Sequence, residues 1–206
     1  MVSRRVLNSL QQGGATLIEF MVASVIGLMA IGIIGSVFVT SQSSAAERGK
    51  ELLLLQQVYG TLQYLKQDIQ RAGYAGDSRS PLRLQDSDDL VYISADAKML
   101  AYAYLDDRQP PEQIRNVSLS WVSGELKVCD RPSSMVTKTV SAATSGCSAI
   151  FEPQQIIVTK FHVQQVSLAS SGVSSAYLTI SMAAALVGDP SVSHALAINI
   201  KQRNWQ

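Results

Sequence analysis

The segment Phe20–Val39, FMVASVIGLMAIGIIGSVFV, contains neither a charged residue nor a proline. At ~1.5 Å of rise per residue, a helix of this length covers about 30 Å, the thickness of a bilayer's hydrocarbon core. Upstream, Arg4 and Arg5 are the only charged residues before Glu19, and basic residues ahead of an apolar segment favour keeping that end in the cytoplasm. The sequence therefore predicts a single membrane-spanning helix with a cytoplasmic N-terminus.

This apolar segment explains the low charge of the whole chain. The 206 residues include 17 Lys and Arg and 16 Asp and Glu, so that 16% are charged and the net charge is +1. Within residues 1–46 only Arg4, Arg5 and Glu19 are charged, and the remainder has the composition of an ordinary soluble domain. This balance excludes a disordered acidic chain and a strongly basic nucleic-acid-binding chain.

Three interpretations of residues 1–46 are open. A cleaved secretory signal peptide would use Ser44–Ala46 as its cleavage site, but the apolar core of such peptides runs about 7–15 residues. A plain single-span anchor explains the length of the segment but leaves Glu19 without a role, although an acid inside the bilayer costs about 2.5–3.5 kcal/mol. The third interpretation takes Glu19 as a functional residue.

The residues around Glu19 resemble the processing site of type IV prepilins and pseudopilins. The run GATLIE (residues 14–19) follows a short basic leader and precedes the apolar segment. In that family the leader ends in Gly, the next residue is methylated, and Glu is fifth in the mature chain. The resemblance implies cleavage between Gly14 and Ala15 by prepilin peptidase, N-methylation of Ala15, and a role for Glu19 in assembly and register. Ala15 departs from the Phe that is more usual there.

Elementary chemistry supports a pairing role for Glu19. Cleavage after Gly14 exposes the α-amine of Ala15, which is four residues from Glu19 and therefore on the same helix face. The ammonium and the carboxylate can neutralise each other within one chain or between neighbouring chains. Because an unpaired charge in an apolar phase is costly, the second pairing fixes the stagger of adjacent helices.

Beyond the membrane segment, the helix is predicted to continue as an amphipathic helix to about Ala72. Gly73 follows as a helix stop, and RAGY (residues 71–74) resembles the end of the long helix in PilW-type minor pilins. Apolar residues recur at helical spacing at Leu55, Val58, Leu62, Leu65, Ile69 and Ala72, with Leu52 extending the stripe backwards.

The rest of the chain reads as short strands separated by turns. Ser123-Gly124 is predicted to be a hairpin turn, Gly188–Ser191 separates the last two strands, and Arg203-Asn204 weakly resembles the end of PilW-type and J-type chains. The expected strands are Leu90–Ser94, Met99–Leu105, Val117–Trp121, Leu126–Cys129, Ile156–Leu168, Ala176–Ala185 and Ala195–Ile200.

These elements predict an α+β fold in which a long N-terminal helix packs on an antiparallel sheet, and this layout resembles that of pilins. The expected organisation has four parts: a cleaved leader (1–14), a transmembrane and pilus-core helix (15–40), its amphipathic continuation (41–73) and a periplasmic β-rich domain (74–206).

The chain contains two cysteines, Cys129 and Cys147. Both lie outside the cytoplasm in the predicted topology, where disulfides persist. A disulfide would close a loop with little core of its own and contribute about 3 kcal/mol in the chain-entropy model. Two free thiols are the alternative.

No catalytic or metal-binding pattern is found in the sequence. His162 and His194 are the only histidines, no Cys/His metal spacing exists, and no serine stands in a nucleophile motif. The acidic residues Asp86, Asp88 and Asp89 lack the EF-hand pattern and are interpreted as a solvated loop. Basic residues are scattered rather than arranged in a stripe. We therefore expect no enzyme activity, no cofactor or metal, and no nucleic-acid partner.

The resemblance implies a PilW-like minor pilin of a type IV pilus, a fimbrium used in adhesion and motility. Such a chain would insert in the inner membrane, with its domain in the periplasm, and then enter the pilus tip or shaft at the cell surface. Its expected partners are inner-membrane lipid, prepilin peptidase, the inner-membrane assembly platform, other minor and major pilins, and a tip adhesin. The alternatives are a J-type pseudopilin of type II secretion and a membrane-anchored periplasmic domain that never polymerises.

Overall fold

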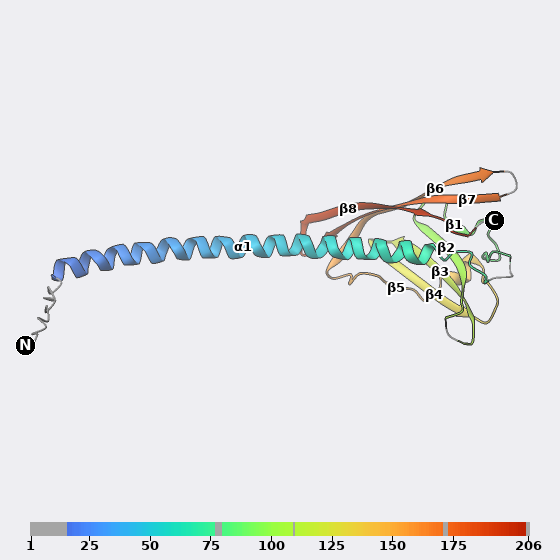
Figure 1. The fold of residues 1–206 in the computed structure, drawn as a ribbon, viewed down its shortest axis with the longest axis horizontal. Helices are drawn as coiled ribbons and strands as arrows, with labels where there is room; N and C mark the ends of the chain where they lie inside the picture. The colour runs from blue at the N-terminus through green and yellow to red at the C-terminus, as the bar shows by residue number, and fades with distance from the viewer. Residues whose placement is uncertain (1–15, 77–79, 109, 171–172, 205–206) are drawn as a thin grey trace, which may run out of the picture. The chain divides into compact units, whose positions relative to one another are not determined.

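The computed structural model of the chain describes residues 16–76, 80–108, 110–170 and 173–204 (Figure 1). Its contacts divide the chain into two compact units, Met1–Arg48 and Gly49–Gln206. The helix α1 (Leu17–Ile69) begins in the first unit and ends in the second. A long N-terminal apolar helix followed by antiparallel sheets is the α+β architecture that the sequence predicts.

In the part of the second unit that the structure describes, eight strands form two antiparallel sheets (Figure 1). Sheet A has the order β1-β2-β3-β4-β5 and sheet B the order β6-β7-β8, so that every neighbour in space is also a neighbour in sequence. The strands are β1 (Val91–Ile93), β2 (Met99–Asp106), β3 (Gln113–Val122), β4 (Glu125–Ser133), β5 (Ser148–Ala149), β6 (Ile156–Ser170), β7 (Val173–Leu186) and β8 (Asp189–Lys201). All seven predicted strands are present, whereas β5, the short helix α2 (Val140–Ala143) and the division into two sheets were not predicted.

One face of α1 joins the two sheets in a single core. Its buried residues are Leu54, Val58, Leu62, Leu65, Asp68 and Ile69. The apolar members of this set share one cluster with Leu119 of sheet A and Leu178 of sheet B. Each buried Leu or Ile side chain contributes about 1.5–3 kcal/mol relative to an exposed one, so this stripe is what holds the domain on the helix.

The predicted start of the stripe is wrong by one helical position. Leu54 is fully buried, whereas Leu55 is half-buried and Leu52 is 56% exposed. Four consecutive leucines at 52–55 satisfy several helical registers equally well, and only the position of the sheets decides among them. The helix also ends at Ile69 rather than Ala72, because the backbone N–H groups of Arg71 and Ala72 bond three residues back instead of four.

Sheet A is covered on both faces, which explains why β2 is buried from Leu100 to Leu105. The even-numbered residues Leu100, Tyr102 and Tyr104 point into the core that contains α1. The odd-numbered residues Ala101, Ala103 and Leu105 belong to a second cluster with Leu84, Val140 and Ala143. The polar segment before β1 and the helix α2 therefore form the outer cover of this sheet.

Two tight turns connect strands in the domain. Ser123 and Gly124 both have positive φ, at 52° and 84°, as the predicted two-residue hairpin requires. The prediction for the last turn is wrong in extent, since Leu186 pairs directly with Asp189 and the turn is Val187-Gly188. Pro190 therefore lies inside β8, where it is tolerated because β8 is an edge strand.

Cys129 and Cys147 form a disulfide, as expected from the sequence. Cys129 is fully buried on β4, and Cys147 immediately precedes β5. The loop that they close contains α2, whose first turn is capped by the Thr139 hydroxyl accepting from the Ala142 N–H at 3.2 Å. The disulfide thus holds the outer cover of sheet A in place.

Reduction of the disulfide is expected to lower the free energy of unfolding of the full chain by about 3 kcal/mol, because the 18-residue separation then no longer restricts the unfolded chain. Urea unfolding in detergent, with and without reductant, measures this. The double variant Cys129→Ser/Cys147→Ser is the control, and its unfolding should not respond to reductant. Equal midpoints for the oxidised and reduced wild-type chain would contradict the prediction.

Candidate functional site: the two ends of the long helix

The first turn of α1 contains a reciprocal capping box formed by Thr16 and Glu19. The backbone N–H of Thr16 donates to Oε2 of Glu19 at 2.9 Å, and the backbone N–H of Glu19 donates to Oγ1 of Thr16 at 3.3 Å. The Thr16 hydroxyl also donates to Oε2 of Glu19 at 3.3 Å. Two N–H groups at the start of the helix are satisfied in this way, and the carboxylate lies at the positive end of the helix dipole.

This arrangement gives Glu19 a partner that the sequence analysis missed. The signal was present, because Thr-x-x-Glu before an apolar run is the sequence signature of a capping box. Gly14 and Ala15 lie outside the described residues, so cleavage between them, methylation of Ala15 and its pairing with Glu19 stay predictions. What the structure adds is that the Glu19 carboxylate is bound within its own chain at Thr16.

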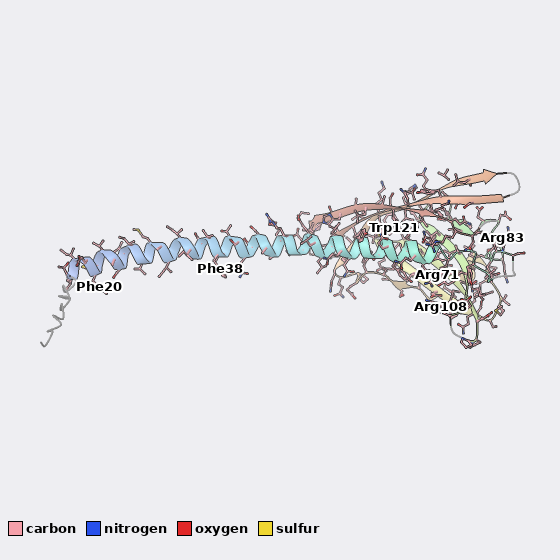
Figure 2. All side chains as sticks on the ribbon, viewed as in Figure 1. Phe20, Phe38, Arg71, Arg83, Arg108 and Trp121 are labelled. Carbon is pink, nitrogen blue, oxygen red and sulfur yellow. A yellow bond between two sulfur atoms is a disulfide. The ribbon has the colours of Figure 1, made fainter. Side chains whose placement is uncertain are left out.

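The helix that follows Glu19 presents apolar side chains to its surroundings on every face. Leu17 is 77% exposed, and Phe20 and Phe38 project outward from α1 (Figure 2). The most apolar stretch of α1 is long enough to cross a membrane, and none of it is buried within the chain. Exposed apolar surface of this extent requires lipid or other protein around it.

The polar side chains of this segment are satisfied within the helix. Ser24 donates to the carbonyl of Phe20 at 2.7 Å, and Thr40 donates to the carbonyl of Ser36 at 3.0 Å. Local bonds of this kind remove the need for water around the hydroxyl groups. The segment is therefore suited to an environment that offers no hydrogen-bond partners.

At the other end of α1, the Asp68 carboxylate lies in the domain core. Oδ2 accepts from the Tyr102 hydroxyl at 2.5 Å, and Oδ1 accepts from the Tyr104 hydroxyl at 3.2 Å. Nη1 of Arg71 lies 3.8 Å from Oδ1, and its guanidinium stands over the Tyr104 ring. The two tyrosines from β2 thus attach the last turn of the helix to sheet A, and sequence pattern alone did not identify Asp68.

Both tyrosines are held in their neutral form. Burial raises the pKa of Tyr102 well above its ordinary value, and the adjacent Asp68 charge raises it further. Burial, followed by the Asp68 charge, raises the pKa of Tyr104 to about 12. A neutral phenol keeps its proton for donation, so these shifts preserve both hydrogen bonds to Asp68.

The RAGY segment that closes the helix contacts the end of the chain's last strand. Gly73 has φ of +82°, a conformation that glycine adopts without strain. The side-chain amide of Asn204 donates to the carbonyl of Ala72 at 2.7 Å and to that of Arg71 at 3.4 Å. The two sequence signatures at residues 71–74 and 203–204 therefore meet in space, and Asn204 caps the C-terminal end of the helix.

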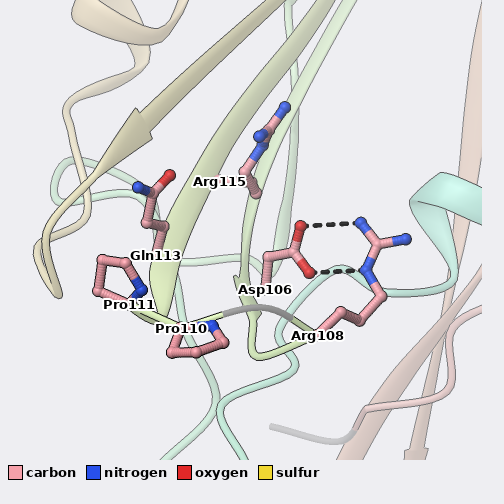
Figure 3. A pocket seen from close by; sticks show the side chains of 6 residues that line it. All are labelled: Asp106, Arg108, Pro110, Pro111, Gln113 and Arg115. Atoms are coloured by element: carbon pink, nitrogen blue, oxygen red, sulfur yellow. Dashed lines mark hydrogen bonds and ion pairs between the residues drawn. The ribbon is translucent and has the colours of Figure 1, made fainter.

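A cavity of about 470 Å³ lies at the β2–β3 connection (Figure 3). It is lined by Asp106, Arg108, Pro110, Pro111, Gln113 and Arg115. Arg108 pairs with Asp106 through two bonds of 2.7 and 2.8 Å, and Arg115 pairs with Asp130. The hydrogen bonds from Arg108 lower the pKa of Asp106 to about 2. Because each guanidinium already has a carboxylate partner, no charge is uncompensated among the described residues that line the cavity.

An apolar helix that is long enough to cross a membrane and continues into an antiparallel β domain is a pilin-like architecture. The chain belongs to the prepilin peptidase-dependent protein B family, whose model matches residues 47–202. The match covers the domain and the second half of α1, and it begins after the proposed processing site and Glu19. No curated protein and no solved structure matches the chain.

Replacing Asp68 by Ala is expected to lower the free energy of unfolding by about 3 kcal/mol, because two buried or nearly buried hydroxyls lose their acceptor. Asp68→Asn keeps one acceptor oxygen and should cost less. Urea unfolding of the full chain measures both variants. Asp106→Ala, which removes an exposed ion pair, is the control with a smaller effect, and an equal effect of Asp68→Ala and Asp106→Ala would contradict the prediction.

Because the pKa of Tyr104 is raised, the free energy of unfolding should fall as the pH rises into the alkaline range. Its folded-state pKa of about 12 exceeds the ordinary value of 10.0, so its contribution is complete below pH 10.0 and is lost as the pH rises towards about 12. Tyr104→Phe removes this contribution. The fall in unfolding midpoint from about pH 9 to about pH 11.5 should be smaller in the variant than in wild type, and an equal fall would show that Tyr104 does not contribute.

Proposed function

We propose that the chain is a minor pilin of a type IV pilus. It would be inserted in the inner membrane with its domain in the periplasm, cleaved between Gly14 and Ala15 by prepilin peptidase, methylated at Ala15, and delivered by an inner-membrane assembly platform. It would then form a priming or tip complex with other minor pilins and enter the pilus ahead of the major pilin. In this role the chain is a structural subunit and not an enzyme.

The observation that carries the proposal is the Glu19 carboxylate at the head of an exposed apolar helix, in a chain whose domain belongs to a prepilin peptidase-dependent family. In a simple membrane anchor this acid would serve only as part of a helix cap. A subunit that moves from lipid into a bundle of other pilin helices needs a charge that aligns it with its neighbours. While the chain is alone, Thr16 supplies the local partner that makes this acid tolerable in the membrane.

Variants at residues 16 and 19 separate helix capping from charge. Glu19→Gln keeps the capping box, since Gln also serves at that position, but removes the negative charge. Glu19→Ala removes both, and Thr16→Ala removes the hydroxyl cap while leaving the carboxylate. If the charge guides assembly, both Glu19 variants should be processed normally and should enter pili about tenfold less than wild type, a loss of about 1.4 kcal/mol in docking.

Processing is measured by the mass of the chain in membranes, and incorporation by the amount of chain in sheared pili. Thr16→Ala is the matched control for local helix stability and should retain most of the incorporation. Normal incorporation of Glu19→Gln would contradict the role of the charge. A chain that keeps residues 1–14 in the presence of prepilin peptidase would contradict the proposed function itself and favour a plain anchor.

A further inference from the structure

The two edges of sheet B differ in how they are protected. The outer edge of β6 is bonded to turns of sheet A, since the Val158 N–H donates to the Gly124 carbonyl at 2.8 Å and the Val163 N–H donates to the Ala97 carbonyl at 2.9 Å. A register shift between Val158 and Lys160 interrupts the same edge. For β8, no backbone hydrogen bond joins the outer edge to any other segment among the residues that the structure describes.

The register of the sheet shows which peptide groups lie on the open edge of β8. Gln202 lies opposite Ala176 and donates to its carbonyl at 3.0 Å, which makes this a hydrogen-bonded pair. In an antiparallel ladder such pairs alternate. The even-numbered residues of β8, from His194 to Ile200, therefore bond to β7. The peptide groups of Ser193, Ala195, Ala197 and Asn199 point away from β7, towards the open edge.

From Ser193 to Ile200 this edge lacks the devices that usually block strand addition. Charged residues, proline and bulges protect natural edge strands. Asp189, Pro190 and the register shift opposite Ala185 and Leu186 stand at one end of β8 and Lys201 at the other, whereas Ser193–Ile200 contains no Asp, Glu, Lys, Arg or Pro and no register shift. The side chains at 193, 195 and 197 are small and exposed, so that they leave the edge accessible.

The core is also incompletely covered along β8. His194, Leu196 and Ile198 are half-buried. Their partners across the ladder on the central strand β7 are Ala184, Met182 and Ile180, each with at most 1% exposure. The difference arises because β7 has a strand on both sides and β8 has one on a single side. A further strand would bury the remaining surface of these three residues.

We propose that β8 accepts an additional strand from another subunit of the assembly. The row of open N–H and C=O groups selects an extended segment, since only a strand can match their spacing. The half-buried residues select apolar side chains at alternate positions of that segment, and the uncharged edge selects a segment without charges. The proposal rests on the proposed function, because the partner is another pilin-like subunit.

Hydrogen exchange tests the proposal on the full chain, purified alone in detergent and recovered in the minor-pilin complex. In the complex, the amides of Ala195, Ala197 and Asn199 should exchange at about one tenth of their rate in the isolated chain, or more slowly still, because they gain acceptors there. The amides of Leu196 and Ile198 are the internal control, since they already bond to β7 and should change little. Equal exchange at Ala195 and Ala197 in both states would overturn the proposal.

A proline at the edge gives a second test. Ala197→Pro removes one outward N–H without removing a bond to β7, and Ala197→Ser keeps that N–H at the same exposed site. Both variants are compared at thermal unfolding midpoints close to that of wild type. The amount of the Pro variant in the complex should then be about tenfold lower than that of wild type, and the amount of the Ser variant should equal that of wild type. If the Pro variant fails to fold, Ala197→Lys takes its place, since Lys blocks edge pairing. Normal entry of the variant that folds would overturn the proposal.

The remaining outcomes separate failure of the edge proposal from failure of the proposed function. Protection of Ala195 and Ala197 that rises with concentration in the pure chain would show that the occupant is a second copy, which overturns the proposal as stated. Absence of the wild-type chain from the minor-pilin complex contradicts the proposed function and the partner with it. Presence of the wild-type chain with unprotected β8 amides contradicts the edge proposal alone.

Discussion

The carboxylate of Asp68 determines how the domain is attached to the long helix. It is 9% exposed, projects from the last turn of α1, and receives hydrogen bonds from two tyrosines of the buried strand β2. An apolar stripe can slide or rotate by one helical position at small cost, as the four leucines at residues 52–55 illustrate. A buried charge with two fixed donors cannot, since misregister leaves it unpaired. The stripe supplies the apolar burial between the helix and the sheets, and Asp68 fixes its register.

The sequence was most informative where a pattern is local. The membrane segment, the hairpin at Ser123-Gly124 and the centres of seven strands follow from composition and alternation alone, because each depends on neighbouring residues. The register of the α1 stripe and the burial of Asp68 were missed, because both depend on strands far away in the chain. The division into two sheets was missed for the same reason, since no strand pattern says which neighbour it pairs with.

At the candidate site, the sequence identified one residue of an interacting pair and missed the other. Glu19 was identified because the composition of an apolar helix does not explain an acid in its first turn. Its partner Thr16 was missed, although it lies in the same six-residue run. Family membership rests on residues 47–202, whereas the proposed processing and assembly residues lie before residue 20. The domain and the first turn of the helix are therefore separate sources of information, and both lead to a pilin-like chain.

Asn204 has a consequence for the order in which the chain folds. Its amide caps the carbonyl of Ala72, from which it is separated by 132 residues. During synthesis the helix emerges first, and its C-terminal end stays without this cap until the entire β domain has left the ribosome. Sheet B in turn completes the core only when β8 has been made. The domain can therefore complete its core only after β8 has been made, and the apolar helix precedes a domain that closes in a late step.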